Sequence, residues 1–165
     1  IRDDDPVIFF EHKTLYTISG DVPDDEYLVP FGKARIVSEG NDCTLVATGR
    51  MVSFCENAAQ ALAEDGITCD IIDPRTTSPL DEDAILDSVE KTGRLVVVDE
   101  TPPRCSFAAD IAALAAGEVF SSLKAPVRQI TGPHSPVPFA KELEGEFVPS
   151  PTKIRDAVSE VVNFK

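Results

Sequence analysis

The sequence has no tryptophan, one methionine and two histidines, and only 7% of its residues are aromatic. No stretch approaches the roughly 18 consecutive apolar residues that a membrane-spanning helix needs. No basic and apolar leader opens the chain. We therefore expect no membrane insertion and a cytoplasmic location. Because the chain begins without methionine and soon enters an apolar segment, we also expect it to be part of a longer protein.

Basic residues are scarce, since 15 Lys and Arg stand against 29 Asp and Glu and give a net charge of -14. Proteins that bind nucleic acids neutralise phosphates with Lys and Arg, so this balance argues against nucleic-acid binding. It argues against anionic membrane surfaces for the same reason. Two interpretations of the acidity stay open: solubility, and a docking surface for a basic partner.

Paired metal-ligand motifs are also missing. The four cysteines are Cys43, Cys55, Cys69 and Cys105, and none belongs to a C-x-x-C pair. The two histidines are far apart in the sequence, so we expect no metal site. The first three cysteines lie in apolar strand and helix patterns and are expected to be buried free thiols. Cys105 precedes a helix, where a thiolate nucleophile is favoured, but no histidine is placed beside it and a structural role is expected.

Two phosphate-binding motifs and one motif of a nucleophilic serine are absent from the sequence. The sequence contains neither G-x-G-x-x-G nor G-x-x-x-x-G-K-[ST], which argues against phosphate cradles built on those loops. The absence of G-x-S-x-G argues against an α/β-hydrolase. From the residues alone, we identify no self-contained active site.

Apolar runs and helical periods alternate along the chain. Strands are expected over residues 6–10, 34–38, 43–47, 69–72, 94–99 and 127–130, and helices over 52–65, 78–93, 106–120 and from 150 onward. The four apolar residues of Leu95–Val98 indicate a central parallel strand that is buried on both faces. This alternation predicts an α/β fold with three layers (α/β/α) and an open, mostly parallel sheet. Residues 1–30, where Pro6–Phe10 is followed by a stretch without a sustained period, are expected to form a linker or surface arm before the regular part, residues 31–165.

Ligands of open α/β sheets usually bind beyond the carboxyl ends of the strands. The loops expected there carry Arg50, Arg75 and Arg104, and we select these arginines as interface candidates because arginine is enriched in interfaces. Arg75 is also placed for a surface ion pair with Asp73. Asp99 and Glu100 are adjacent on a strand and should point to opposite faces, which argues against a catalytic carboxylate pair.

The loop Gly132–Phe139 contains three prolines and is expected to be stiff. His134 and Phe139 lie in it and are interface candidates, because a pre-organised loop loses little entropy on docking. The alternative is a loop that merely connects a strand to a helix.

Several segments resemble β-subunits of thiamine-diphosphate-dependent 2-oxo acid dehydrogenases. They are PVIFFEHKTLY (residues 6–16), VPFGKA (29–34), IDPRTTSPLD (72–81) and KTGRLVVVDE (91–100). The segments 103–106 and 133–139 are most similar to the acetoin dehydrogenase branch, and His134 stands where pyruvate and branched-chain members more often have Asp. The resemblance covers essentially the whole chain.

This resemblance implies a fold like the transketolase C-terminal domain, with four parallel strands and one antiparallel edge strand. It assigns residues 1–30 to the tail of an upstream pyrimidine-binding domain with its linker, and residues 31–165 to the transketolase C-terminal-like domain. The parent enzyme would use thiamine diphosphate with Mg, and the family's cofactor-activating residues lie upstream. We therefore assign no catalytic, cofactor-binding or metal residue here and expect the isolated fragment to be inactive.

The resemblance further implies an α-subunit and a second β-subunit as partners in a heterotetramer. The acyl group would pass to lipoamide on a dihydrolipoyl acyltransferase, whose peripheral binding domain docks near the C-terminal end, where Phe164 is our candidate. Two alternatives stay open: a non-catalytic assembly or regulatory module of the same fold, and a fragment of a transketolase or deoxyxylulose-phosphate synthase. The choice between acetoin, pyruvate and branched-chain substrates is left open.

Overall fold

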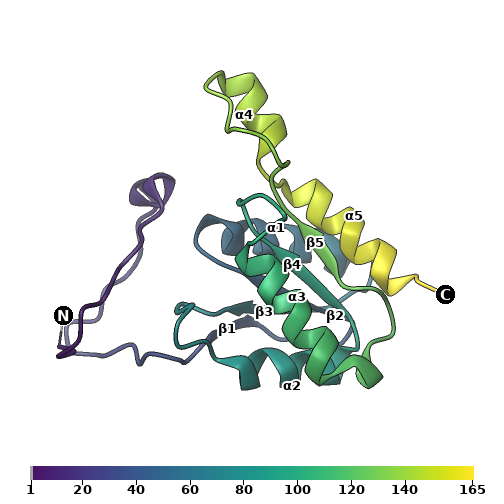
Figure 1. Ribbon diagram of the computed structural model, residues 1–165, viewed down its shortest axis with the longest axis horizontal. Coiled ribbons are helices and arrows are strands. Elements are labelled where there is room, and N and C mark those ends of the chain that lie inside the picture. Colours follow the sequence, from purple (N-terminus) through teal and green to yellow (C-terminus); the bar gives the residue numbers. More distant parts are fainter. Residues whose placement is uncertain (1) are drawn as a thin grey trace.

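The structure, a computed structural model, describes residues 2–165. Its centre is a five-stranded sheet in the order β1-β3-β2-β4-β5 (Figure 1). The strands are β1 (Arg35–Ser38), β2 (Cys43–Ala47), β3 (Cys69–Asp73), β4 (Leu95–Val98) and β5 (Arg128–Ile130). β1 pairs antiparallel with β3, and the other pairs are parallel. The predicted parallel sheet with one antiparallel edge strand is thereby confirmed.

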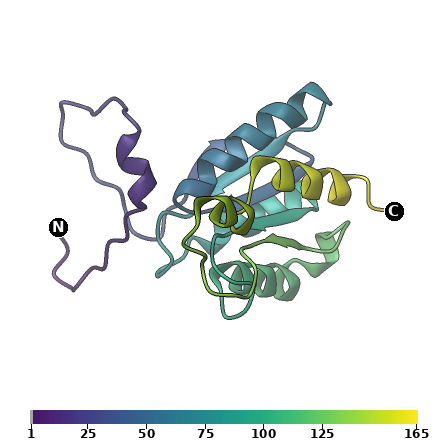
Figure 2. The same ribbon diagram turned by 90° about the horizontal axis from the view of Figure 1, so that it is seen from above.

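Helices cover both faces of this sheet. The helices of the chain are α1 (Arg50–Glu64), α2 (Glu82–Thr92), α3 (Phe107–Glu118), α4 (Lys141–Phe147), which stands away from the sheet (Figure 1), and α5 (Pro151–Val162), with short 3-10 turns η1 (Lys13–Thr17) and η2 (Phe120–Ser122). α1 and α5 pack on one face, whereas α2 and α3 pack on the other (Figures 1 and 2). The expected three layers are present.

Strand β4 shows why the sheet lies at the centre of the core. Its four residues are all buried. Val96 and Val98 join the cluster formed with α1 and α5, while Leu95 and Val97 join the cluster formed with α2 and α3. Because successive side chains of a strand point to opposite faces, a continuous apolar run can satisfy two helical layers at once.

The helix ends follow local sequence chemistry. The side chain of Ser106 accepts a hydrogen bond from the Ala109 amide and begins α3, and Ser150 begins α5 in the same way, with Pro151 in the first turn. Gly93 ends α2 in the left-handed conformation at a φ of 74°, where a residue without Cβ is favoured.

A polar network ties the strands together at the amino end of the sheet. The buried carboxylate of Asp70 accepts hydrogen bonds from the Gly40 amide at 2.7 Å, from Ser88 Oγ at 2.6 Å and from Lys91 Nζ at 2.6 Å. Thr44 Oγ1, on the neighbouring strand, lies 2.7 Å from Ser88 Oγ. These contacts satisfy polar groups that would be costly to bury alone.

The predicted strand over residues 6–10 is wrong. This segment has no strand assignment and belongs to an arm that lies to one side of the sheet (Figures 1 and 2). Ile8, Phe9 and Phe10 are exposed. β-propensity expresses how well a side chain fits a half-buried sheet surface, and none of the residues 2–165 provides such a surface to this segment.

Helix α4 was not predicted from the sequence. It is only seven residues long, contains Gly145 and buries one side chain, Phe147. A single buried residue produces no helical period, so the pattern could not indicate it. Within residues 2–165, no helix is long and apolar enough to cross a membrane.

Candidate functional site

Five of the six candidate residues lie at one edge of the sheet. Arg50 follows β2, Arg75 follows β3 and Arg104 follows β4, whereas His134 and Phe139 follow β5. These four strands are parallel, so their carboxyl ends meet at the same edge. We call this edge, with its loops 48–50, 74–81, 99–106 and 131–140, the carboxyl edge.

Phe164 does not belong to the carboxyl edge. Helix α5 runs back along the sheet and ends near residue 94, which precedes β4. There the guanidinium of Arg94 donates from Nε to the carbonyl of Val161 at 3.0 Å and from Nη2 to that of Val162 at 3.4 Å. Phe164 is half exposed just beyond this contact. The candidates therefore divide into two surfaces at opposite ends of the sheet.

The best-defined polar contact at the carboxyl edge joins the arm to the sheet. His12 Nε2 lies 2.7 Å from Glu100 Oε2, and both side chains are 27% exposed. On the other side of the ring, His12 Nδ1 accepts from the Thr14 amide at 3.3 Å. With Nδ1 accepting from that amide, Nε2 is the ring nitrogen that faces Glu100.

Arg50 completes this contact. Its Nη1 lies 3.8 Å from Glu100 Oε1, and its guanidinium stacks 4.7 Å from the centre of the Phe54 ring. We call His12, Glu100 and Arg50 the arm latch. The sequence could not indicate the latch, because His12 and Glu100 are 88 residues apart.

Asp99 and Glu100 lie just beyond β4, not on a strand as expected, and they have different partners. Asp99 is buried and accepts from the Thr101 amide at 3.0 Å, from Thr101 Oγ1 at 2.7 Å and from the Ala108 amide at 3.3 Å. It therefore organises the turn that leads into α3. Glu100 instead turns to the arm, and the two carboxylates share no partner.

The prediction of an ion pair between Asp73 and Arg75 is wrong, because the two side chains have other partners. Asp73 Oδ1 accepts from the main-chain amide of Arg75 at 3.1 Å, while the Arg75 guanidinium donates to the carbonyl of Ala34 at 3.4 Å. Arg75 has a φ of 59°, a left-handed conformation that an Asx turn can support. The side chain thus fastens the loop to the residue that precedes β1.

Three cysteines are buried as expected, whereas the structural role expected for Cys105 is wrong. Cys43, Cys55 and Cys69 are buried free thiols. Burial raises the pKa of all three, that of Cys69 to about 12. Cys105 is exposed at a φ of 50°, so its thiol has no packing role in this chain.

The proline loop is folded over α4. Pro133, Pro136 and Pro138 line an open groove of about 260 Å³ together with the Phe147 ring. A Cβ at Gly132 would come within 2.7 Å of that ring and 2.9 Å of the Glu100 carbonyl, so only glycine fits. Phe139 is fully exposed at the end of this loop. The Phe147 ring packs against this loop at Gly132. The sequence analysis did not identify Phe147.

The carboxyl edge has several exposed polar and aromatic side chains. Among residues 2–165, no group of three His, Cys, Asp or Glu side chains is arranged to hold a metal ion. Within the arm latch, the Glu100 carboxylate is paired with His12 and Arg50. Exposed side chains at this edge include Arg75, Arg104, His134, the Phe139 ring and the apolar side chains of the arm.

The fold and this edge define the class of protein. The chain belongs to the transketolase C-terminal domain family, whose pattern matches residues 32–154. A split-gene transketolase, described as an inactive β4 tetramer, superposes with a TM-score of 0.73 at 23% identity, over 88% of this chain and 45% of that one. A transketolase from Pichia stipitis superposes with a TM-score of 0.52 at 17% identity, over 81% and 18% of the two chains. These likenesses show the fold.

Relatives of similar sequence are β-subunits of an acetoin oxidoreductase and of a pyruvate dehydrogenase. The acetoin:2,6-dichlorophenolindophenol oxidoreductase subunit beta of Bacillus subtilis is 52% identical over 98% of this chain and 47% of its own length. The subunit of the same name from Cupriavidus necator is 52% identical over 95% and 46%. The pyruvate dehydrogenase E1 subunit beta of Rickettsia bellii is 42% identical over 100% and 51%. The resemblance stated from the motifs is confirmed, and the chain spans about half the length of these relatives.

Proposed function

We propose that this chain is the C-terminal part of a β-subunit whose enzyme cleaves acetoin or decarboxylates a 2-oxo acid and passes the acyl group to lipoamide. The observation that carries the proposal is the identity to dehydrogenase β-subunits over nearly the whole chain. Acetoin is the preferred substrate, because the two acetoin relatives are 52% identical and the pyruvate relative 42%. In this role the enzyme works in the cytoplasm.

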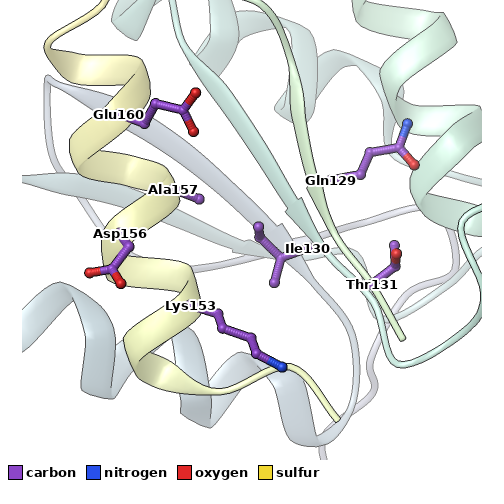
Figure 3. A pocket seen from close by; sticks show the side chains of 7 residues that line it. All are labelled: Gln129, Ile130, Thr131, Lys153, Asp156, Ala157 and Glu160. Carbon is purple, nitrogen blue, oxygen red and sulfur yellow. The ribbon is translucent and has the colours of Figure 1, made fainter. Parts of the chain in front are cut away.

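The cofactor of this enzyme would be thiamine diphosphate with Mg. The residues described here show two grooves, one lined by prolines and Phe147 and one by α5 and β5 (Figure 3), and both are open to solvent rather than enclosed sites for it. Among residues 2–165, no group of three His, Cys, Asp or Glu side chains could hold a metal ion. We therefore assign the cofactor site to the parent complex and derive no chemical step from this chain.

The task of the domain is subunit assembly at the carboxyl edge. Arg50, Arg75, Arg104, His134 and Phe139 are positioned there by four parallel strands, and arginine and aromatic residues are common interface anchors. The expected partners are an α-subunit and a second β-subunit in a heterotetramer.

The arm supports the same proposal. Residues 2–30 carry exposed apolar side chains, among them Ile8, Phe9 and Phe10. A concentration of exposed apolar groups is typical of a surface that another domain or chain covers. We assign residues 1–30 to the tail of an upstream domain and its linker, and residues 31–165 to the assembly domain.

Co-expression with the candidate α-subunit tests the assembly role. The whole β-subunit should copurify with α and oxidise acetoin faster than pyruvate. Phe139→Ser should reduce copurification, whereas Phe120→Ser is the matched control, because Phe120 is also exposed but lies in η2, away from the carboxyl edge. Equal copurification of both variants would contradict the assembly role, and a complex inactive on acetoin, pyruvate and branched-chain acids would contradict the enzyme class.

The second surface, around Phe164, is proposed to dock the acyltransferase's peripheral binding domain. The net charge of -14 favours a basic partner through electrostatic steering. Titrating that binding domain into the complex should show an affinity that falls as salt rises and falls again when Phe164 and Lys165 are deleted. An affinity that responds to neither change would exclude this docking surface.

A further inference from the structure

Two sets of contacts hold the arm at the carboxyl edge. The first is the arm latch, in which Glu100 pairs with His12 at 2.7 Å and with Arg50 at 3.8 Å. His12 also lies over the start of α1, since a Cβ at Gly49 would stand 3.8 Å from the His12 Cβ. On its other side, the His12 ring accepts from the Thr14 amide at 3.3 Å and so caps the turn η1. His12 is thus in contact with three different segments.

The second set holds the base of the arm, residues 31–34, just before β1. The Gly32 amide donates to Thr76 Oγ1 at 3.0 Å, and the Ala34 amide donates to the buried carboxylate of Asp81 at 2.8 Å. The chain between the latch and the base therefore forms a loop whose two ends are fastened to the same edge of the sheet.

The apolar segment Ile8–Phe10 lies just before the latch and has no such contacts. Each of its three side chains is at least 80% exposed. Three adjacent large apolar side chains form a patch that a folded protein normally covers. Among residues 2–165 no element packs on this patch, so its cover has to come from elsewhere.

The latch limits where this cover can stand. Because an extended chain advances at most about 3.6 Å per residue, the Phe10 Cα lies within about 7 Å of the His12 Cα, and the Ile8 Cα within about 14 Å. His12 is itself fixed to Glu100. Whatever covers the apolar segment must therefore stand beside loop 99–106 at the carboxyl edge.

The length of the relatives indicates what the cover is. The chain matches 47% of the Bacillus subtilis acetoin subunit and 51% of the Rickettsia bellii pyruvate subunit. In a β-subunit of that length, the remaining part comes before this chain and joins it a few residues from Ile8. A partner surface attached through so short a linker has an effective concentration of about millimolar or more, which favours it over a separate chain.

On the basis of the proposed function, we propose that the arm latch docks the upstream domain of the same β-subunit beside loop 99–106. The apolar segment belongs to the docked surface, and His12, Glu100 and Arg50 are positioning residues that set its direction. The carboxyl edge is thereby divided into two parts. The latch side serves the upstream domain of its own subunit, and the proline loop stays available to other subunits.

A thiol reagent measures this docking, because Cys105 lies in loop 99–106 and is exposed in this chain. In the whole β-subunit without its α-subunit, the docked domain should cover this thiol, so N-ethylmaleimide should modify it slowly. His12→Ala removes the arm's partner for Glu100 without altering the loop that carries the thiol. We expect modification about fivefold faster, the factor that loss of one partly exposed ion pair produces. Mass spectrometry of the Cys105 peptide measures the rate.

Two controls separate release of the domain from unfolding. Lys13→Ala changes the next residue of the arm, which is exposed and outside the latch, and should leave the rate unchanged. The other three thiols, those of Cys43, Cys55 and Cys69, are buried in the core and should stay unmodified in every variant. Faster modification at Cys105 alone therefore reports release of the upstream domain.

Three outcomes would overturn the inference. They are fast modification of Cys105 in the wild-type β-subunit, equal rates in His12→Ala and Lys13→Ala, and protection that appears only with the α-subunit or grows with protein concentration. The last outcome would assign the cover to another chain. Because the assay uses no substrate, its failure is distinguishable from failure of the proposed function, which acetoin oxidation by the complex measures.

Discussion

The two ends of the sheet use their polar residues in opposite ways. At the amino end, Asp70 is buried and has three donors from the same chain, and Arg94 holds the last turn of α5. At the carboxyl edge, Arg104, His134 and Phe139 are exposed. One end is completed by its own chain, whereas the other has side chains available for neighbours.

This difference supports the proposal that the amino end is structural and that the carboxyl edge binds partner subunits. Buried polar groups must be paired within the fold, because leaving them unpaired costs much more than an ordinary hydrogen bond contributes. Polar side chains in the exposed loops at the carboxyl edge can bond to water instead, so they are available for recognition. Four predictions test the contrast between the ends.

The largest effect should come from Asp70, compared with Asp73 at the other end of the same strand. Asp70→Ala leaves the Gly40 amide and Ser88 without their acceptor, so we expect a loss of about 3 kcal/mol in the free energy of unfolding. Asp73→Ala removes one acceptor for the Arg75 amide and should cost less than about 1 kcal/mol. Urea unfolding measures both values, and equal losses would remove the contrast.

Arg94 and Arg50 form the second comparison. Arg94→Ala removes donors to three main-chain carbonyls and should cost about 2 kcal/mol. Arg50→Ala removes a long ion pair and a stacking contact with Phe54, so less than about 1 kcal/mol is expected. Thermal unfolding followed by circular dichroism should give Arg94→Ala a clearly lower melting temperature than Arg50→Ala. The reverse order of melting temperatures would contradict this view.

Acid should weaken both ends through one carboxylate each. Hydrogen bonds from Thr68 lower the pKa of Asp42 at the amino end, and the Ala34 amide lowers the pKa of Asp81 near the carboxyl edge. A carboxyl whose pKa is lower in the folded state than in the unfolded state stabilises the fold when the pH is above the pKa of the unfolded state, near 3.9. This stabilisation is lost as the pH falls through the pKa of the folded state.

Urea unfolding between pH 7 and pH 2.5 should therefore show stability falling below about pH 4. Asp42→Asn and Asp81→Asn should each make this fall shallower, whereas Asp24→Asn, in the exposed arm, should not. A fall of unchanged steepness in both variants would contradict the assigned hydrogen bonds.

The smallest effect should come from the arm latch. A pair that is partly open to solvent contributes about 1 kcal/mol, so His12→Gln should change global unfolding little. It should release the arm, and chymotrypsin should then cut after Phe9, Phe10 or Tyr16 a few times faster. Glu100→Gln should have a similar effect, and combining both changes should add little, because each removes the same contact. Lys13→Gln is the control, and an equal acceleration by it would exclude the latch.

Much of the fold could be predicted because it follows from local patterns. The run Leu95–Val98 indicated a central strand, and Ser106, Ser150 and Gly93 marked helix ends that the structure confirms. The prediction of a strand over residues 6–10 was wrong, because a local pattern does not show whether a pairing strand is present. Their apolar pattern resembles a strand, but a strand exists only where another strand pairs with it.

The candidate surface was only partly predictable. Its loops could be located, because the carboxyl ends of parallel strands gather at one edge. The contact of His12 with Glu100, the turn that directs Arg75 to Ala34, and the Phe147 ring beneath the proline loop could not, because each depends on residues distant in sequence.

The sequence by itself determined the alternation of strands and helices, the acidic charge and the resemblance to dehydrogenase β-subunits, because these are properties of order and composition. Only the tertiary structure decided that the arm is fastened to Glu100 and that its base is held by Thr76 and Asp81. Such features depend on which main-chain and side-chain groups remain unpaired once the core has formed, and pairing across long sequence separations is set by packing rather than by local pattern.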